Sequence, residues 1–177
     1  MGRLVNSTYV TLDGVIESPQ DWPSLASFSE SGGRIQLELL QASDAVLMGR
    51  RTYEGFVPVW TSMSGDPYSD RINAMPKYVA STTLTDPKWN NTTVIDGDLA
   101  EYVANLKDEG NLVQYGFGAV SRPLLQAGLI DELRLWLHPF FVGRGDLIYQ
   151  DSLTATFDLN DVTRLDSGVV ILTYTKP

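Results

Sequence analysis

The sequence predicts an α/β fold with three layers, in which helices cover both faces of a mixed, mainly parallel sheet and the chain ends in an antiparallel hairpin. The main observation is that a strand-like segment followed by a helix-like segment occurs four times, a pattern that forms parallel sheets. Residues 156–177 instead alternate about a turn at 166–168 and predict the hairpin. A length of 177 residues with 43% hydrophobic residues suits one core, so we expect a single domain over 1–177.

The expected strands are short apolar or alternating segments bounded by turn signals. In chain order they lie at 3–12, 45–49, 77–81, 92–95, 111–116 and 131–141. The expected helices have apolar residues at helical spacing and end near glycine, proline or a short polar residue. They lie at about 33–42, 50–60, 99–109 and 119–128. Residues 15–28 form a Pro- and Ser-rich loop of a length typical of a lid, and 61–76 are interpreted as an irregular surface stretch.

Charge and composition exclude several classes of function. The 22 Asp and Glu residues outnumber the 13 Lys and Arg residues, and a net charge of −9 argues against nucleic-acid binding, because phosphate backbones are repelled. The absence of cysteine excludes disulfides, thiolate metal sites and cysteine nucleophiles, and a single histidine argues against a zinc site, so we expect no metal. The first residues lack the apolar core of a signal peptide, and no apolar run reaches the ~20 residues of a membrane span. We therefore predict a cytoplasmic protein without a membrane partner.

Parallel sheets bind ligands at the carboxyl ends of their strands, so the residues just after each strand are the candidates for a site. Gly49, Arg50, Arg51 and Thr52 follow the strand at 45–49 and open a helix. A helix start offers free N–H groups and a partial positive charge, and the arginines add forked donors, which favours phosphate binding. The alternative is that the arginines only solubilise the helix start.

Two further strand ends carry groups that suit a nucleotide. Ser81 and Thr82 follow the strand at 77–81 and offer hydroxyls to a ribose or its 2′-phosphate, although they can equally satisfy a turn. Glycines after the strand at 111–116 let backbone N–H groups approach a pyrophosphate, or simply form a tight turn. That segment contains Gly116, Phe117, Gly118, Ala119 and Val120. Together the three strand ends predict a dinucleotide site with a bias toward the extra phosphate of NADP.

The first strand ends in Asp13-Gly14, beside the expected lid. A carboxylate there suits substrate orientation or proton relay, and an Asp-Gly turn is an equally good interpretation. Aromatic side chains can stack on a flat heterocyclic substrate, although aromatic residues at such spacing usually lie in a core. The candidates for such stacking are Trp22, Phe28, Tyr53 and Phe56.

The strand at 131–141 alternates two sets of side chains. Leu133, Leu135 and Leu137 alternate with Arg134, Trp136 and His138. The second set predicts the polar face, and an exposed face with a tryptophan favours a surface covered by a second chain, so we expect a homodimer. A lone histidine on such a face is expected to be structural.

Six sequence blocks span nearly the whole chain in a characteristic order. They are TLDGVI at 11–16, LMGRRTYE at 47–54, PKYVASTT at 76–83, YGFG at 115–118, LLQAGLIDELRL at 124–135 and PFFVGRG at 139–145. In these blocks the sequence resembles the dihydrofolate-reductase-like superfamily, in particular the reductase domain of bifunctional riboflavin-biosynthesis deaminase-reductases and its free-standing relatives. The resemblance implies that residues 49–52 meet the NADPH phosphates, that Ser81 and Thr82 hold the adenosine end, and that 116–120 line the pyrophosphate and nicotinamide ribose.

The resemblance also implies an NADPH-dependent reductase that transfers a hydride to a polarised C=N or C=O bond, with Asp13 facing the active site. The lid carries Glu17 and Asp21 rather than basic residues, which suits the phosphoribosylamino-uracil of the riboflavin pathway poorly, so we expect another heterocyclic substrate. Phe117 stands where family members often have a glycine, and its side chain is expected to narrow or redirect the pyrophosphate contact. Two alternatives stay open: a catalytically silent nucleotide-binding module, and a dimeric scaffold protein on the same fold.

Overall fold

The computed structural model describes residues 1–25, 29–149 and 151–177. Within these residues the strands are β1 (Leu4–Thr11), β2 (Ala45–Gly49), β3 (Lys77–Ala80), β4 (Thr92–Ile95), β5 (Leu112–Tyr115), β6 (Glu132–His138), β7 (Asp158–Arg164) and β8 (Val170–Thr175). The α-helices are α1 (Glu30–Gln41), α2 (Arg50–Trp60), α3 (Pro67–Ala74), α4 (Leu99–Glu109) and α5 (Ser121–Gln126), and a 3₁₀ turn, η1, spans Pro19–Asp21. The predicted single domain over 1–177 stays a prediction.

The strands form one mixed sheet in the order β4-β3-β2-β5-β1-β6-β8-β7. The six strands from β4 to β6 are parallel, while β8 runs antiparallel to both β6 and β7. This confirms the predicted fold class, a mainly parallel sheet with a C-terminal antiparallel hairpin. The edge strand β7 is exposed along most of its length and carries an irregularity between Leu159 and Asp161.

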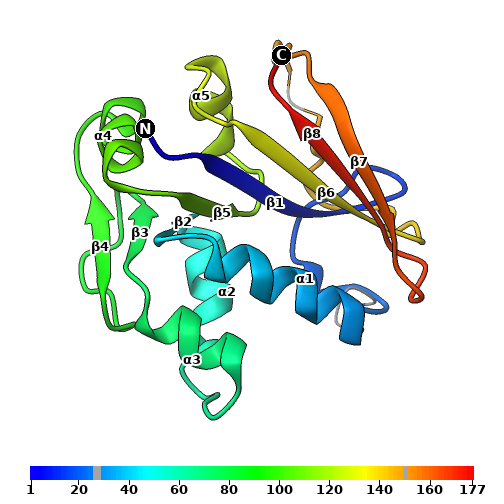
Figure 1. Cartoon of the computed structure of the whole chain (residues 1–177), viewed down its shortest axis with the longest axis horizontal. Helices are drawn as coiled ribbons and strands as arrows, with labels where there is room; N and C mark the ends of the chain where they lie inside the picture. Colours follow the sequence, from blue (N-terminus) through cyan, green and yellow to red (C-terminus); the bar gives the residue numbers. More distant parts are fainter. Residues whose placement is uncertain (26–28, 150) are drawn as a thin grey trace.

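Helices cover both faces of the sheet, as Figure 1 shows. On one face α1, α2 and α3 pack on a core that includes Leu40, Tyr53 and Ile72 from the helices. On the other face α4 and α5 contribute Val103 and Leu124 to a second core. The short strands β2 and β5 lie between these cores, which explains why they are buried on both faces. Among the described residues, no helix has the length and apolarity that crossing a bilayer would need.

The sequence prediction missed helix α3 and placed the start of α1 too late, because the N-cap residue of each helix was not recognised. The stretch 61–76 contains α3, whose N-cap Asp66 accepts hydrogen bonds from the Tyr68 and Ser69 amides at 3.1 Å each. An Asp-Pro pair is a helix start as well as a turn signal. Helix α1 begins at Glu30 rather than near 33, since the Ser29 hydroxyl accepts from the Gly32 amide at 3.2 Å.

The predicted polar face of β6 is wrong. Trp136 and His138 are both fully buried, because α1 extends across β1 and β6 and covers that face. Tyr9 from β1 and Ile35 from α1 pack against this third core. The opposite face of β6 presents half-buried leucines instead. The argument for a dimer through the tryptophan face therefore fails.

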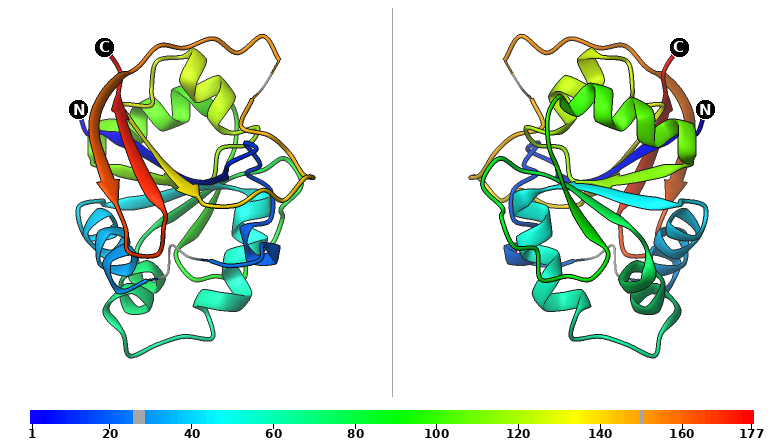
Figure 2. Two further views of the ribbon diagram at one scale, coloured as in Figure 1. Left: turned by 90° about the vertical axis from the view of Figure 1, so that its right-hand side faces the viewer. Right: turned by 90° about the vertical axis from the view of Figure 1, so that its left-hand side faces the viewer.

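The carboxyl ends of the parallel strands lie at one edge of the sheet, and both chain ends lie at the other. β1 begins there, and β8 ends with Thr175 opposite Glu132, the first residue of β6. At the carboxyl edge, the segment after β1 runs beside the segment after β6, with Val15 bridged to Leu147 (Figure 2). From here on we use the name lid only for residues 12–17, which lead into the loop at 15–28 that was expected to form a lid. We call residues 140–148 the strap.

Candidate functional site

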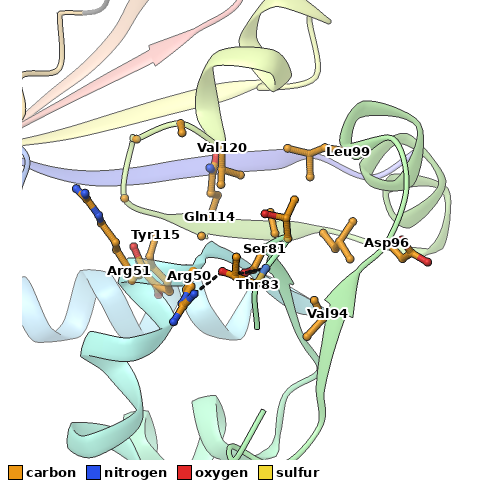
Figure 3. A pocket seen from close by; sticks show the side chains of 18 of the residues that line it. Arg50, Arg51, Ser81, Thr83, Val94, Asp96, Leu99, Gln114, Tyr115 and Val120 are labelled. Carbon is orange, nitrogen blue, oxygen red and sulfur yellow. Dashed lines mark hydrogen bonds between the residues drawn. The ribbon is translucent and has the colours of Figure 1, made fainter. Parts of the chain in front are cut away.

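A cavity of about 1010 Å³ opens at the carboxyl ends of β2, β3, β4 and β5, where Figure 3 shows its lining side chains. It is lined by Gly49, Arg50, Arg51, Thr52, Ala80, Ser81, Thr82, Thr83, Val94, Ile95, Asp96, Gly97, Leu99, Gln114, Tyr115, Gly116, Gly118, Ala119, Val120 and Asp146. The three strand ends singled out from the sequence therefore meet in one cavity. Register explains this, because parallel pairing of β3, β2 and β5 brings their last residues to the same level.

Arg50 lies between α2 and the end of β3. Its Nε donates to Glu54 Oε1 at 2.7 Å, one turn along α2, and its Nη1 donates to the Thr83 hydroxyl. The Ser81 hydroxyl accepts from the Thr83 and Leu84 amides at 3.2 and 3.0 Å, which fixes the turn that presents these hydroxyls. Arg50 and the hydroxyls after β3 thus form one cluster of donors, at which a phosphate group would find several hydrogen-bond partners.

Arg51 extends from the start of α2 toward the other end of the cavity (Figure 3). Its side chain is 81% exposed, and Nη1 lies 3.0 Å from Asp146 Oδ2 in the strap and 3.6 Å from Glu17 Oε1 in the lid. Both predicted phosphate-binding arginines are therefore paired with carboxylates. The charged side chains that line the cavity are two arginines and two aspartates, Asp96 and Asp146.

Glycines let the ends of β2 and β5 approach each other closely. Gly116 has φ +81°, and a Cβ there would lie 2.9 Å from the Thr52 hydroxyl oxygen. A Cβ at Gly49 would lie 3.0 Å from Val120 Cγ2. A side chain at either position would therefore require Thr52 or Val120 to shift, and at Gly116 the positive φ adds backbone strain.

A chain of buried side-chain hydrogen bonds fixes the turn after β5 to strands β1 and β5. Asn6 Nδ2 donates to Gly116 O at 2.9 Å and to Gln114 Oε1 at 3.0 Å, while Gln114 Nε2 donates to the Ser121 hydroxyl at 2.9 Å. Phe117 is 5% exposed and lies outside the cavity lining. The expected narrowing of the pyrophosphate contact by its ring therefore has no support in the cavity lining, and it stays a prediction. The backbone amides of residues 116–120 remain at the cavity.

Asp13 lies outside the cavity lining and holds the strap. Its Oδ1 accepts from the Thr11 hydroxyl at 2.5 Å and the Val142 amide at 3.3 Å, and its Oδ2 accepts from the Gly143 amide at 2.8 Å. The Thr11 hydroxyl, assisted by both amides, lowers the pKa of Asp13 although partial burial opposes this. The group is thus an ionised acceptor. Its predicted catalytic role stays a prediction.

The aromatic candidates separate into core and rim. Tyr53 is 4% exposed, and its hydroxyl accepts from the Trp89 amide at 3.1 Å, while Phe56 packs on Tyr115 with ring centroids 5.5 Å apart. Both lie in the core beneath α2 rather than along the cavity, which contradicts their stacking role. Phe28 lies outside the described residues.

Trp22 lines a second cavity of about 540 Å³ between the lid and the strap. Its indole N–H donates to Glu17 O at 3.0 Å, and its ring meets His138 edge-on at 5.2 Å between centroids. The lining consists of Glu17, Ser18, Asp21, Trp22, Pro23, Phe141, Val142, Arg144 and Gly145. Glu17 contacts Arg51 and Asp146, which line the first cavity, so the two cavities adjoin. Of the four aromatic candidates, Trp22 alone is placed by the described residues at a cavity.

Sequence reasoning missed the part of the first cavity that β4 and the strap provide. Asp96 and Gly97 directly follow β4 and carry the same strand-end signal as the three ends that were singled out. Asp146 lies 95 residues after Arg51 in the chain, and no local sequence pattern predicts the contact between them. In the described residues there is also no group of three or more His, Asp or Glu side chains that could hold a metal ion.

In the comparison with protein families, the model of the RibD C-terminal domain matches residues 3–171 of this chain. A curated relative, the uncharacterised protein YyaP of Bacillus subtilis (strain 168), is 25% identical over 183 residues, which cover 97% of this chain and 94% of YyaP. The match thus extends over nearly the full length of both proteins.

Solved structures share the fold at low sequence identity. A pyrimidine reductase-like protein from Corynebacterium diphtheriae has a TM-score of 0.69 at 12% identity, with 98% of this chain and 91% of that chain covered. RibD from Acinetobacter baumannii has a TM-score of 0.70 at 16% identity, with 100% of this chain and 58% of that chain covered. A deaminase/5-amino-6-(5-phosphoribosylamino)uracil reductase from Thermotoga maritima has a TM-score of 0.69 at 14% identity, with 99% and 57% covered. The chain thus spans a little over half the length of these two larger proteins.

Proposed function

Because the chain belongs to the RibD C-terminal domain family, a family of reductases, we propose that it is an NADPH-dependent reductase of a small heterocyclic substrate. The observation that carries this proposal is the single cavity into which three strand ends converge. A dinucleotide needs donors for a pyrophosphate and for an adenosine end, and this cavity has both at opposite ends of one groove.

Each part of the cofactor has a matching part of the cavity. The Arg50 cluster with Ser81, Thr82 and Thr83 suits the 2′-phosphate that distinguishes NADPH from NADH, because it combines one guanidinium with three hydroxyls. The N-terminus of α2 and the backbone amides of residues 116–120 suit the pyrophosphate. The apolar side chains of Val94 and Leu99 would pack against the adenine ring.

When bound, NADPH supplies the hydride, and the residues of this chain supply position and a dry environment. Once the substrate is also bound, the lid and the strap, which Asp13 joins to each other, would cover the reacting bond and exclude water from it. The lowered pKa of Asp13 makes its carboxylate an acceptor at neutral pH, so we favour substrate orientation over proton donation for this residue.

The second cavity is the natural place for the substrate, because it adjoins the first and has Trp22 as a flat wall. Two carboxylates, Glu17 and Asp21, line it against one guanidinium, Arg144. A phosphorylated substrate would meet net negative charge there, which favours a heterocycle without a phosphate group.

Calorimetric titration with NADPH and NADH tests the cofactor. We expect NADPH to bind more tightly than NADH, and Arg50→Ala to weaken NADPH binding about tenfold to hundredfold, since a hydrogen bond to a charged group contributes about 1.5–3 kcal/mol. NADH binding should change little. Arg34→Ala is the matched control, because it removes an exposed arginine with the same kind of i,i+4 partner, Glu38, from α1.

The alternatives give different results in the same titration. A protein that binds neither cofactor is the silent module, and the reductase proposal then fails. A protein that binds NADPH but oxidises it with none of a panel of pterins, pyrimidines and other heterocycles matches the scaffold alternative.

The homodimer also stays a proposal, now on a different surface. Leu159 and Val162 of β7 are 56% and 53% exposed, on the sheet face opposite the buried tryptophan of β6. Exposed apolar side chains that lie together on an edge strand form a surface that a second chain could cover. Light scattering tests the proposal directly, because a monomer mass over the whole micromolar range would contradict it.

A further inference from the structure

The lid and the strap are joined along their length by backbone hydrogen bonds. The Leu12 amide donates to Phe140 O at 2.9 Å, the Ile16 amide to Asp146 O at 2.9 Å, and the Ile148 amide to Gly14 O at 2.8 Å. Val15, between these bonds, is only 2% exposed. Two segments that share backbone bonds and a buried side chain separate only if those bonds break, so the lid and the strap form one unit.

Arg51 ties this unit to the helix on the other side of the cavity. Its guanidinium contacts Asp146 Oδ2 at 3.0 Å in the strap and Glu17 Oε1 at 3.6 Å in the lid. The second oxygen of Glu17 accepts the Asp146 amide at 3.0 Å, which brings both carboxylates to the same guanidinium. We call Arg51, Glu17 and Asp146 the clasp.

The clasp occupies a position that an anionic ligand would need. Arg51 and Asp146 both line the first cavity, and Arg51 is the lining arginine that contacts the lid. A pyrophosphate bound at the start of α2 would gain from the guanidinium and be repelled by both carboxylates. Both carboxylates lie at Nη1 of Arg51, so a phosphate that approaches this nitrogen competes with them for its N–H groups.

We propose that Glu17 and Asp146 compete with the cofactor pyrophosphate for Arg51, so that the lid–strap unit is released from α2 when the pyrophosphate binds. The inference rests on the proposed function for the identity of the anion, and the clasp itself rests on the contacts above. Without cofactor, the ion pairs of Arg51 then hold the lid–strap unit against α2, and with cofactor bound the unit is released. The two carboxylates lower the affinity of the cofactor, because they must give up Arg51 before the pyrophosphate can bind it.

Asp146→Asn tests the competition, because it keeps the backbone bonds of Asp146 and removes one charge. We expect NADPH and inorganic pyrophosphate each to bind about two- to fivefold more tightly to this variant, since an exposed ion pair contributes about 0.2–1 kcal/mol. Glu17→Gln should act in the same direction, and the double variant should exceed either. Glu38→Gln is the control, because it removes an equally exposed carboxylate paired with an arginine far from the cavity, and we expect no change.

Hydrogen exchange gives a readout that needs no cofactor. Without ligand, Asp146→Asn should speed exchange of the Ile16 and Ile148 amides together, because a unit that has lost its anchor on α2 opens its internal backbone bonds more often. Glu38→Gln should leave both exchange rates unchanged. Saturating NADPH should speed both amides in the wild-type protein. Unchanged or weaker NADPH binding by Asp146→Asn, alongside a wild-type protein that binds, overturns the inference. If no variant binds NADPH, the proposed function fails, and the exchange rates and pyrophosphate affinities still decide whether the clasp operates.

Discussion

Lys107 is a buried charged residue far from the cavity, and we expect its replacement to lower the free energy of unfolding. Its side chain is 2% exposed, and Nζ donates to Asp131 Oδ2 at 2.5 Å and to Leu129 O at 2.9 Å. Asp131 in turn accepts from the Leu4 amide at 2.8 Å and pairs with Lys176 at 2.9 Å. One carboxylate thereby joins the start of β1, helix α4 and the end of the chain.

We expect Lys107→Met to lower the free energy of unfolding by about 3 kcal/mol at pH 7. Breaking a buried ion pair by removing one partner costs about 3–5 kcal/mol, and Lys176 and the Leu4 amide keep part of the compensation for Asp131. For a chain of this length the melting temperature should fall by roughly 6–12 °C. Lys88→Met is the control, because its pair with Asp86 is exposed and should contribute less than about 1 kcal/mol.

Urea unfolding measures both variants, and pH gives a second test of the same pair. Burial alone would raise the pKa of Asp131, but the hydrogen bonds from Lys107, Lys176 and the Leu4 amide lower it below the ordinary 3.8. A carboxyl group whose pKa is lower in the folded than in the unfolded state stabilises the fold at pH values above the unfolded-state pKa. That stability is lost as the pH falls through the folded-state pKa. The difference between wild type and Lys107→Met should therefore shrink below about pH 4. A loss under about 1 kcal/mol at pH 7 would refute the reasoning.

Two further predictions concern the strap and the single histidine. Gly145→Ala should destabilise the protein more than Gly143→Ala. A Cβ at Gly145 (φ +108°) would lie 2.9 Å from Val15 Cγ1, whereas a Cβ at Gly143 (φ +72°) meets nothing within 4 Å. Equal melting temperatures of the two variants would contradict this prediction. Burial lowers the pKa of His138 below 6.5, although its hydrogen bond to Trp136 O opposes the shift. As the pH drops below about 6.5 the unfolded chain is therefore protonated before the folded one, and the free energy of unfolding should fall. Urea unfolding at pH 7.5 and 5.5 should show this slope in the wild type and not in His138→Phe, and an NMR titration of the ring with a pKa of 6.5 or above would exclude it.

The strand–helix alternation predicted the sheet and the position of the cavity because both depend on local periodicity. Segments 45–49 and 111–116 are short, mostly apolar and bounded by turn signals, so their burial and parallel pairing could be inferred without any tertiary contact. The side to which β6 turns its tryptophan could not be inferred. Trp136 and the leucines beside it are all apolar, and the choice between faces depends on how far α1 reaches across the sheet.

The site shows the same division between local and distant signals. Arg50 and Ser81 each follow a strand, so their meeting was predictable from topology. The partners of Arg51 were not, because Glu17 and Asp146 arrive on two loops whose paths depend on backbone bonds between them. Tyr53 was misjudged for a related reason, since on α2 a rotation of one position decides whether a ring meets the cavity or the core.

Both chain ends leave the sheet at the edge opposite the cavity, with the first residues beside the end of α4 and the last beside the start of β6. A second protein attached at either end would therefore approach from behind and leave the entrance open. The same geometry suits immobilisation, because a linker at Met1 or Pro177 would orient every molecule with its cavity facing the solvent. Attachment through the strap would have the opposite effect and block the entrance.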